Sequence, residues 1–261
     1  MSGDGWDPAQ YGRFRDERRQ PFDDLLALIG PVPGGRAVDL GCGTGELTVD
    51  LHRHVQATET IGIDRSAAML AAAGAVAGGG VTFRHQDIAD FPGPDDGPFD
   101  VIAANASLHW ISDQPALLRR LAGALAEHGQ LAFQVPANFD HPSHTIAGEV
   151  AAEAPFAAAL AAHPIHLPSV LAPEVYARLL YDLGFAEQHV RLQVYGHLLP
   201  STGEVVEWLK GSYLTPFREG LAPAFYEEFL HRYRSRLVAA LGDHRPYFYP
   251  FKRILGWAHR P

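Results

Sequence analysis

Cysteine and lysine are the scarce residues of this 261-residue chain. The single cysteine, Cys42, excludes a disulfide framework within the chain. Lysine and arginine together number 21, only two of them lysine, against 30 acidic residues, and the formal net charge is −9. A general nucleic-acid binder carries a basic stripe instead. We therefore expect no nucleic-acid partner.

Long apolar runs are missing as well. The opening residues, MSGDGWDPAQ, lack the apolar core of a signal peptide, and no run reaches membrane-spanning length. The apolar fraction of 47% is ordinary for a folded globular chain. We expect a cytoplasmic protein without a membrane partner, long enough for one large domain or for one domain with an inserted cap.

The first half of the chain alternates between strand and helix patterns. Apolar segments that end in polar or glycine-rich turns predict strands at 36–40, 60–66, 81–88, 99–107 and 130–136. Helical patterns separate most of these segments. The alternation predicts an α/β fold, a Rossmann-like, doubly wound, mostly parallel sheet with helices on both faces. In such a sheet the ligand lies beyond the carboxyl ends of the strands.

The pattern changes after residue 136, where strand segments give way to stretches rich in alanine, proline and histidine. We predict a helical substrate cap built from residues 137–172 and 200–245. The expected division of the rest is N-terminal lid helices at 1–30, a cofactor-binding core at 31–136, and remaining strands and a helix of the core at 173–199 and 246–261.

The stretch VDLGCGTGELT places three glycines between a strand and a helix, at Gly41, Gly43 and Gly45. This spacing is one residue short of the dinucleotide fingerprint. A pyrophosphate in the turn would lie beside Asp39 and Glu46, and like charges at close range cost kilocalories. S-adenosylmethionine carries an ammonium and a sulfonium and no phosphate, so it fits the turn better. A dinucleotide dehydrogenase is the weaker alternative.

Polar residues follow the next three strands. Asp64, 19 residues after the last glycine of the turn, can accept both ribose hydroxyls, and Arg65 follows it. Asp87 can take the adenine amino group while Ile88 packs on the ring. Asn105 ends the fourth strand, where it would face the methionine portion. We assign these five residues, with Asp39 and the three glycines, to the cofactor site.

The segments VDLGCGTGE, IGIDRS, HQDI and FDVIAANASLHW resemble those of class I S-adenosylmethionine-dependent methyltransferases. WDPAQYGRFRDERRQPFDDLL, PANFDHPSH and PFKRI resemble the trans-aconitate 2-methyltransferase family, over nearly the whole chain. The resemblance implies methyl transfer to a carboxylate of a small polycarboxylic acid, giving a methyl ester and S-adenosylhomocysteine. The family pattern has a second arginine just before the proline, whereas this chain has Gln20 there and Arg19 one place earlier, so the identity of the acid stays open.

Residues near the start and after the fourth strand are candidates for acceptor binding. A predicted helix places Tyr11, Phe14 and Arg18 on one stripe, and the Arg18 guanidinium would hold a carboxylate as a bidentate fork or extend to solvent. His109 and Trp110 should border the methyl group. His109 is our catalytic candidate, either as a base for a hydroxyl acceptor or as a donor to a carboxylate. A carboxylate is ionised at neutral pH and needs no base.

Further candidates lie late in the chain. Tyr195, Arg218 and Arg253 are expected substrate ligands, with a surface position as the alternative for each charge. Two other functions stay open: a methyltransferase acting on a hydroxyl or amine, and a non-catalytic S-adenosylmethionine-binding protein. The histidines of HPSH and HPIH lie in proline-bearing segments with few acids nearby, so we expect no metal.

Overall fold

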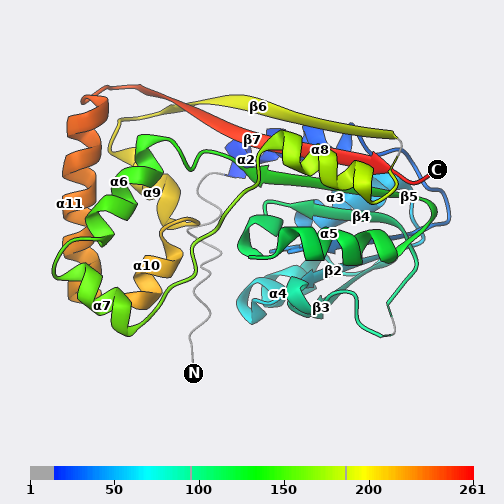
Figure 1. Cartoon of the computed structure of the whole chain (residues 1–261). Coiled ribbons are helices and arrows are strands. Elements are labelled where there is room, and N and C mark those ends of the chain that lie inside the picture. Colours follow the sequence, from blue (N-terminus) through cyan, green and yellow to red (C-terminus); the bar gives the residue numbers. More distant parts are fainter. Residues whose placement is uncertain (1–14, 95, 186) are drawn as a thin grey trace. The chain divides into compact units, whose positions relative to one another are not determined.

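The computed structural model describes residues 15–94, 96–185 and 187–261 (Figure 1). The chain forms two compact units, and its path passes between them several times. The first, which we call the α/β unit, contains residues 18–136, 169–193 and 253–261. The second, the helical unit, includes residues 137–168 and 194–252.

A seven-stranded sheet in the order β3-β2-β1-β4-β5-β7-β6 organises the α/β unit. Strands β1 to β5 pair in parallel, and β7 runs antiparallel to β5. The predicted doubly wound, mostly parallel sheet is confirmed. The strands are β1 (Arg36–Leu40), β2 (Glu59–Asp64), β3 (Val81–His85), β4 (Phe99–Asn105), β5 (Leu125–Pro136), β6 (Glu187–Leu199) and β7 (Tyr247–His259).

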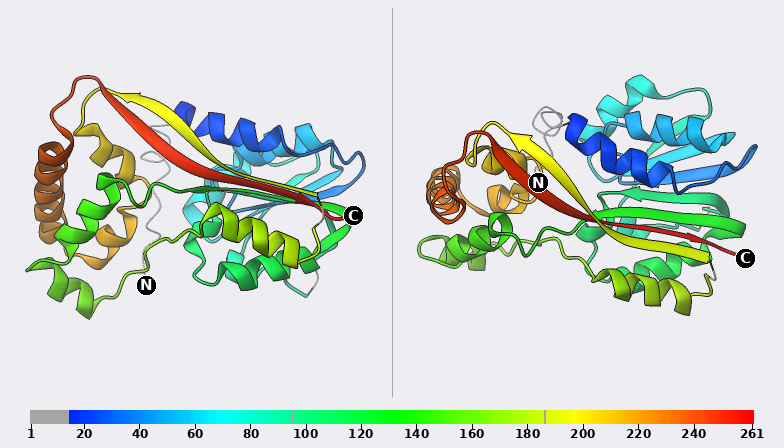
Figure 2. Two further views of the ribbon diagram at one scale, coloured as in Figure 1. Left: turned by 45° about the horizontal axis from the view of Figure 1, so that its top comes forward. Right: turned by 90° about the horizontal axis from the view of Figure 1, so that it is seen from above.

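Helices cover both faces of this sheet. In the right-hand view of Figure 2, α2, α3 and α4 lie on one face and α5 and α8 on the other. The central strands β1 and β4 are buried along nearly their whole length, as expected for strands covered on both sides. The helices are α2 (Arg15–Leu26), α3 (Glu46–Val55), α4 (Ala67–Ala73), α5 (Gln114–Gly123) and α8 (Pro173–Asp182), with short 3-10 turns η1 (Gly74–Val76), η2 (Ile88–Asp90) and η3 (Leu108–Trp110).

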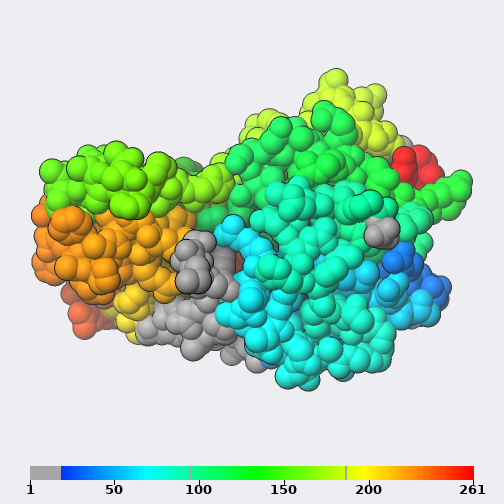
Figure 3. All heavy atoms as spheres, turned by 90° about the horizontal axis from the view of Figure 1, so that it is seen from below, coloured from blue at the N-terminus to red at the C-terminus, as the bar shows by residue number. Residues whose placement is uncertain are grey.

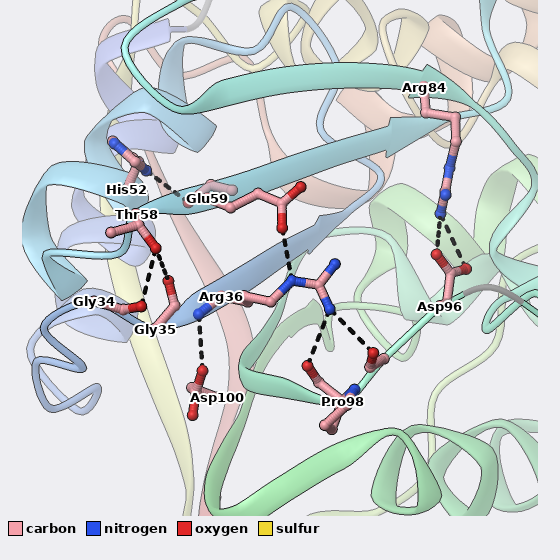
Figure 4. Close-up of polar contacts among 12 residues, drawn as sticks. Gly34, Gly35, Arg36, His52, Thr58, Glu59, Arg84, Asp96, Pro98 and Asp100 are labelled. Atoms are coloured by element: carbon pink, nitrogen blue, oxygen red, sulfur yellow. Dashed lines mark hydrogen bonds and ion pairs between the residues drawn. The ribbon is translucent and has the colours of Figure 1, made fainter.

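Arg36 ties together the beginnings of three strands (Figure 4). Its Nε donates to Glu59 Oε2 at 2.6 Å, and its backbone N–H donates to Asp100 Oδ2 at 2.8 Å. Its Nη1 also donates to the Gly97 carbonyl at 3.0 Å. These contacts fix β1, β2 and β4 at the end of the sheet opposite to the glycine turn. The Arg36 contacts therefore lie away from the carboxyl ends of these strands, where the candidate site is.

The helical unit has an aromatic core. The Phe229 ring stacks on Phe217 with centroids 5.1 Å apart and meets Phe156 edge-on at 5.7 Å. Figure 3 shows α6 and α7 (green) lying along α10 and α11 (orange), which agrees with the contacts of α6 with α11 and of α7 with α10. The unit's helices are α6 (Pro142–Ala151), α7 (Phe156–Ala162), α9 (Glu204–Lys210), α10 (Thr215–Gly220) and α11 (Pro223–Leu241).

A helix that crosses a membrane needs about 20 mostly apolar residues. Within the described ranges, no single helix is both long and apolar enough to cross one. Helices α6 and α7 meet the length and composition only as a pair, and that pair is bent by 82°.

The units divide the chain differently from the expected domains in three places, the smallest being residues 169–172, which we expected in the cap and which belong to the α/β unit. Helix α2 belongs to the α/β unit from Arg18 onward, whereas we expected residues 1–30 as separate lid helices. Residues 194–199 and 246–252 cluster with the helical unit, although we expected them in the core. The reason is strand length: β6 and β7 are 13 residues each, so each strand begins in one unit and ends in the other.

Candidate active site

The glycine turn between β1 and α3 has three residues with left-handed backbone. Gly41, Gly43 and Gly45 have φ angles of 80°, 55° and 80°, which glycine adopts without steric cost. A Cβ on Gly41 would lie 2.5 Å from Ser107 Cβ, and one on Gly45 would lie 2.4 Å from Phe83 Cζ. Around a Cβ on Gly43, no described atom beyond the chain neighbours lies within 4 Å. Among the described residues the turn is packed at both ends and open at Gly43, where a ligand can reach the backbone.

Asp39 lies beneath the turn in β1 and is only 4% exposed. Thr48 Oγ1, from the first turns of α3, donates to Asp39 Oδ2 at 2.6 Å. Burial raises the Asp39 pKa to about 6, since the Thr48 hydrogen bond offsets burial only in part and the charge of Asp64 adds to it. A carboxylate that is this costly to ionise is stabilised by a nearby cation and destabilised by a phosphate. The electrostatics therefore agree with the preference inferred from the sequence.

Asp64 is oriented by two backbone donors. The N–H of Gly43 donates to Asp64 Oδ2 at 2.9 Å, and the N–H of Ser66 donates to Oδ1 at 2.8 Å. The side chain of Arg65 is exposed, and its carbonyl accepts from His85 Nε2 at 2.9 Å. The geometry thus places Asp64 against the glycine turn and leaves Arg65 facing solvent.

The turn η2, which follows the third strand, brings Ile88 to the same place. Ile88 is 9% exposed, and its Cδ1 would be 3.5 Å from a Cβ on Gly41. Strand β3 ends at His85, so Asp87 lies in the following turn and not at the strand end that we expected. There Asp87 Oδ1 accepts the Ala89 N–H at 2.9 Å and begins the turn η2. Because one oxygen is used in this way, the other is the one available to a ligand.

Asn105 ends β4 and begins a row of polar side chains. Its Oδ1 accepts from Gln134 Nε2 at 2.8 Å, and Gln134 Oε1 accepts from Arg253 Nη1 at 2.9 Å. Arg253 is 5% exposed and lies opposite Pro136 in the β5–β7 register, at the carboxyl end of β5. The structure therefore brings Arg253, one of our three late candidates, to the same edge of the sheet as Asn105.

His109 lies in the turn η3 and is 5% exposed. Burial, together with the positive charge of Arg253, lowers its pKa to about 3. Its Nδ1 is buried and has no hydrogen-bond partner among the described residues. The Trp110 ring packs beside it, with centroids 5.1 Å apart. His109 is therefore neutral at physiological pH, and it is a poor general base in this state.

The side chains of the other early and late substrate candidates lie outside the described part of the chain or in the helical unit. Tyr11 lies outside the described residues, and Arg18 lies in α2 with its side chain outside the described part. Tyr195, at 3% exposure, and Arg218, in α10, belong to the helical unit. The positive charge of Arg218 acts on the hydroxyl of Tyr226 within that unit.

Three supporting residues were missed in the sequence. Thr48 bonds Asp39, Ser107 Oγ donates to the Leu40 carbonyl, and Gln134 joins Asn105 to Arg253. All three side chains are buried. Gln134 left a readable signal, because LAFQVP carries one polar residue within an apolar strand, and a buried amide needs partners.

Comparison with known proteins decides the family. A family model described as a methyltransferase domain matches residues 11–190. A trans-aconitate 2-methyltransferase from Deinococcus radiodurans is 40% identical over 98% of each chain. This chain belongs to that methyltransferase family. A second relative of the same name, from Streptomyces avermitilis, is 37% identical over 98% of this chain and 97% of its own.

The fold comparison agrees with the family. The YcgJ protein from Bacillus subtilis superposes with a TM-score of 0.60, covering 93% of this chain and 98% of the other at 16% identity, which bears on the fold alone. The sheet also departs from the dinucleotide-binding order 3-2-1-4-5-6, because β7 is inserted antiparallel between β5 and β6. The predicted methyl donor of this methyltransferase, S-adenosylmethionine, is confirmed by its family.

Proposed function

We propose that this methyltransferase transfers a methyl group from S-adenosylmethionine to a carboxylate of a small polycarboxylic acid such as trans-aconitate, giving a methyl ester. One observation supports a carboxylate as the acceptor. The buried guanidinium of Arg253 lies at the carboxyl end of β5 and donates to Gln134, which in turn donates to Asn105. The names of the full-length relatives support the same acceptor.

The residues at the glycine turn fit the donor. Among the described residues Gly43 leaves room at the backbone, Asp64 lies against the same turn as an acceptor suited to ribose hydroxyls, and Asp39 favours a positive charge nearby. We place Ile88 against the adenine ring and Asp87 at its amino group. When bound, S-adenosylmethionine supplies an electrophilic methyl group, whose bond to sulfur breaks as the bond to the acceptor oxygen forms.

The chain's own residues supply alignment and not proton removal. A carboxylate is already ionised at neutral pH, so no base is required. Arg253 would hold and orient it, and burial of the site would exclude water, so that positioning contributes most of the rate. His109, with its pKa near 3, would act as a neutral hydrogen-bond partner. This low basicity argues against a hydroxyl acceptor that needs His109 as its base.

A direct assay tests the proposal. The purified chain is incubated with S-adenosylmethionine and, separately, trans-aconitate, citrate and a short fatty acid, and methyl esters are measured by mass spectrometry. We expect an ester from a polycarboxylic acid. The absence of an ester from every acid would remove the carboxylate claim.

A variant links that activity to the structure. Arg253→Gln removes a charge-assisted contact of about 1.5–3 kcal/mol, so the KM for the acid should rise by about ten- to a hundredfold. Arg178→Gln is the control, because Arg178 lies on the outer face of α8 and pairs with Asp182. Equal KM values for the two variants would contradict the role of Arg253.

A further inference from the structure

Three polar side chains form a row at the carboxyl ends of β4 and β5. Arg253 Nη1 donates to Gln134 Oε1 at 2.9 Å, and Gln134 Nε2 donates to Asn105 Oδ1 at 2.8 Å. Gln134 is 1% exposed, the least exposed member of the row. All three residues belong to the α/β unit.

The chemistry of arginine fixes the direction of every hydrogen bond in the row. A guanidinium carries five donors and no acceptor, so Gln134 must turn its oxygen toward Arg253. The amino group of Gln134 must then face Asn105, and Asn105 must accept through its oxygen. The polar group that Asn105 retains for a ligand is its amino group, which is a donor.

The row begins at the glycine turn. Asn105 precedes Ala106, whose left-handed backbone, with φ of 55°, directs its N–H to the Gln134 carbonyl at 2.8 Å. Ser107 follows, packs against Gly41 and donates to the Leu40 carbonyl. Asn105 is therefore two residues from a side chain that packs on the glycine turn, and its own side chain is joined through Gln134 to Arg253.

We propose that Gln134 is a positioning residue that holds the Arg253 guanidinium in place and fixes Asn105 as a donor, and so makes this end of the sheet selective for carboxylate groups. This inference rests on the proposed function, because it explains how one guanidinium selects an anionic acceptor. Gln134 itself need not touch the substrate. Its role is to keep the side-chain amide of Asn105 from turning its oxygen toward an anionic ligand.

Gln134→Glu reverses this arrangement at nearly constant volume. The new carboxylate pairs with Arg253 and offsets its charge. It cannot donate to Asn105, so Asn105 turns its amino group inward and its oxygen toward the ligand. We expect the KM for the acid to rise by about tenfold or more, with a smaller change in kcat, since charge-assisted contacts are the strong ones.

Gln134→Met and a control on the same strand separate positioning from packing. Methionine removes both hydrogen bonds but adds no negative charge, so its KM should lie between the wild-type and Gln134→Glu values. Gln130 is also buried in β5, where its side chain bonds Gly30 and Trp257. Gln130→Glu should lower the melting temperature and leave KM within about twofold, because Gln130 lies four residues before Gln134, away from the carboxyl end of the strand.

The outcomes are distinct. A wild-type chain that forms no ester overturns the proposed function. A wild-type chain that forms ester, with a Gln134→Glu KM within about twofold of it, overturns the positioning role alone. A KM for Gln134→Met above that for Gln134→Glu also overturns it, because loss of packing would then matter more than polarity.

Discussion

Replacement of Gly43 by alanine is expected to weaken cofactor binding while leaving the fold intact. Gly43 has a φ of 55°, and an added Cβ would meet no described atom beyond its chain neighbours within 4 Å. The folded chain therefore bears only the backbone cost of a left-handed alanine, about 1–2 kcal/mol. The methyl group would instead occupy the space through which a ligand approaches the turn.

Two other glycines provide matched comparisons. Gly34, in the turn before β1 (Figure 4), has a φ of 82° and equally open surroundings. Gly34→Ala should therefore cost the same stability and leave the site unchanged. Gly41→Ala should cost about 1–3 kcal/mol more than either, since its Cβ would lie 2.5 Å from Ser107 Cβ and force a shift.

Calorimetric titration with S-adenosylhomocysteine, paired with thermal unfolding, measures both effects. We expect Gly43→Ala and Gly34→Ala to have similar melting temperatures, with affinity at least about tenfold lower, or 1.4 kcal/mol, only in the former. Equal affinity in the two variants would refute the placement of the ligand at Gly43.

Three further outcomes follow from ionisation. Affinity for S-adenosylmethionine should fall as pH drops below about 6, because the cation favours the ionised form of Asp39, whose raised pKa is about 6. Titration calorimetry from pH 5 to 8 measures this fall. Thr48→Val should move the pH midpoint of the fall upward, because it removes a hydrogen bond that lowers the Asp39 pKa. His144, buried in the helical unit, has its pKa lowered by burial to about 3, so its contribution to stability is complete above 6.5 and is lost as pH falls toward 3. Between pH 7 and pH 5, His144 should lower the free energy of unfolding by roughly 2 kcal/mol. Urea unfolding at the two pH values should therefore show a smaller decrease for His144→Gln than for the wild type, and equal decreases would contradict this role. Burial and the charges of Asp39 and Asp64 raise the Cys42 pKa, so alkylation at pH 8 should be slow until the chain unfolds, and rapid alkylation of the folded chain would count against this environment.

The placement of the proposed cofactor residues in the fold was largely readable from the sequence. The glycine turn, Asp64 and Asn105 each lie at or just past the end of a strand, and parallel strands bring such ends to one edge of a sheet. Local patterns were therefore enough to place these residues together. Asp87 was placed two residues wrongly, because strand ends are the least certain part of a periodicity argument.

The positions of the proposed acceptor-binding residues could not be predicted in the same way. Gln134 and Arg253 are 119 positions apart, and their contact depends on the antiparallel register of β7 against β5. A shift of one residue in that register would turn Arg253 to the other face of the sheet. Tyr195 shows the same limit, since we expected residues 173–199 in the core and Tyr195 clusters with the helical unit. Arg218 lies in the helical unit, within the range expected for the cap.

The central claim is that a carboxylate oxygen receives the methyl group. It is tested most directly by incubating the chain with trans-aconitate and S-adenosylmethionine deuterated in its methyl group, and then treating the isolated product with mild base. We expect deuterated methanol and recovery of the acid, because only an ester is hydrolysed under these conditions. A labelled product that survives the base would place the methyl group elsewhere and contradict the account.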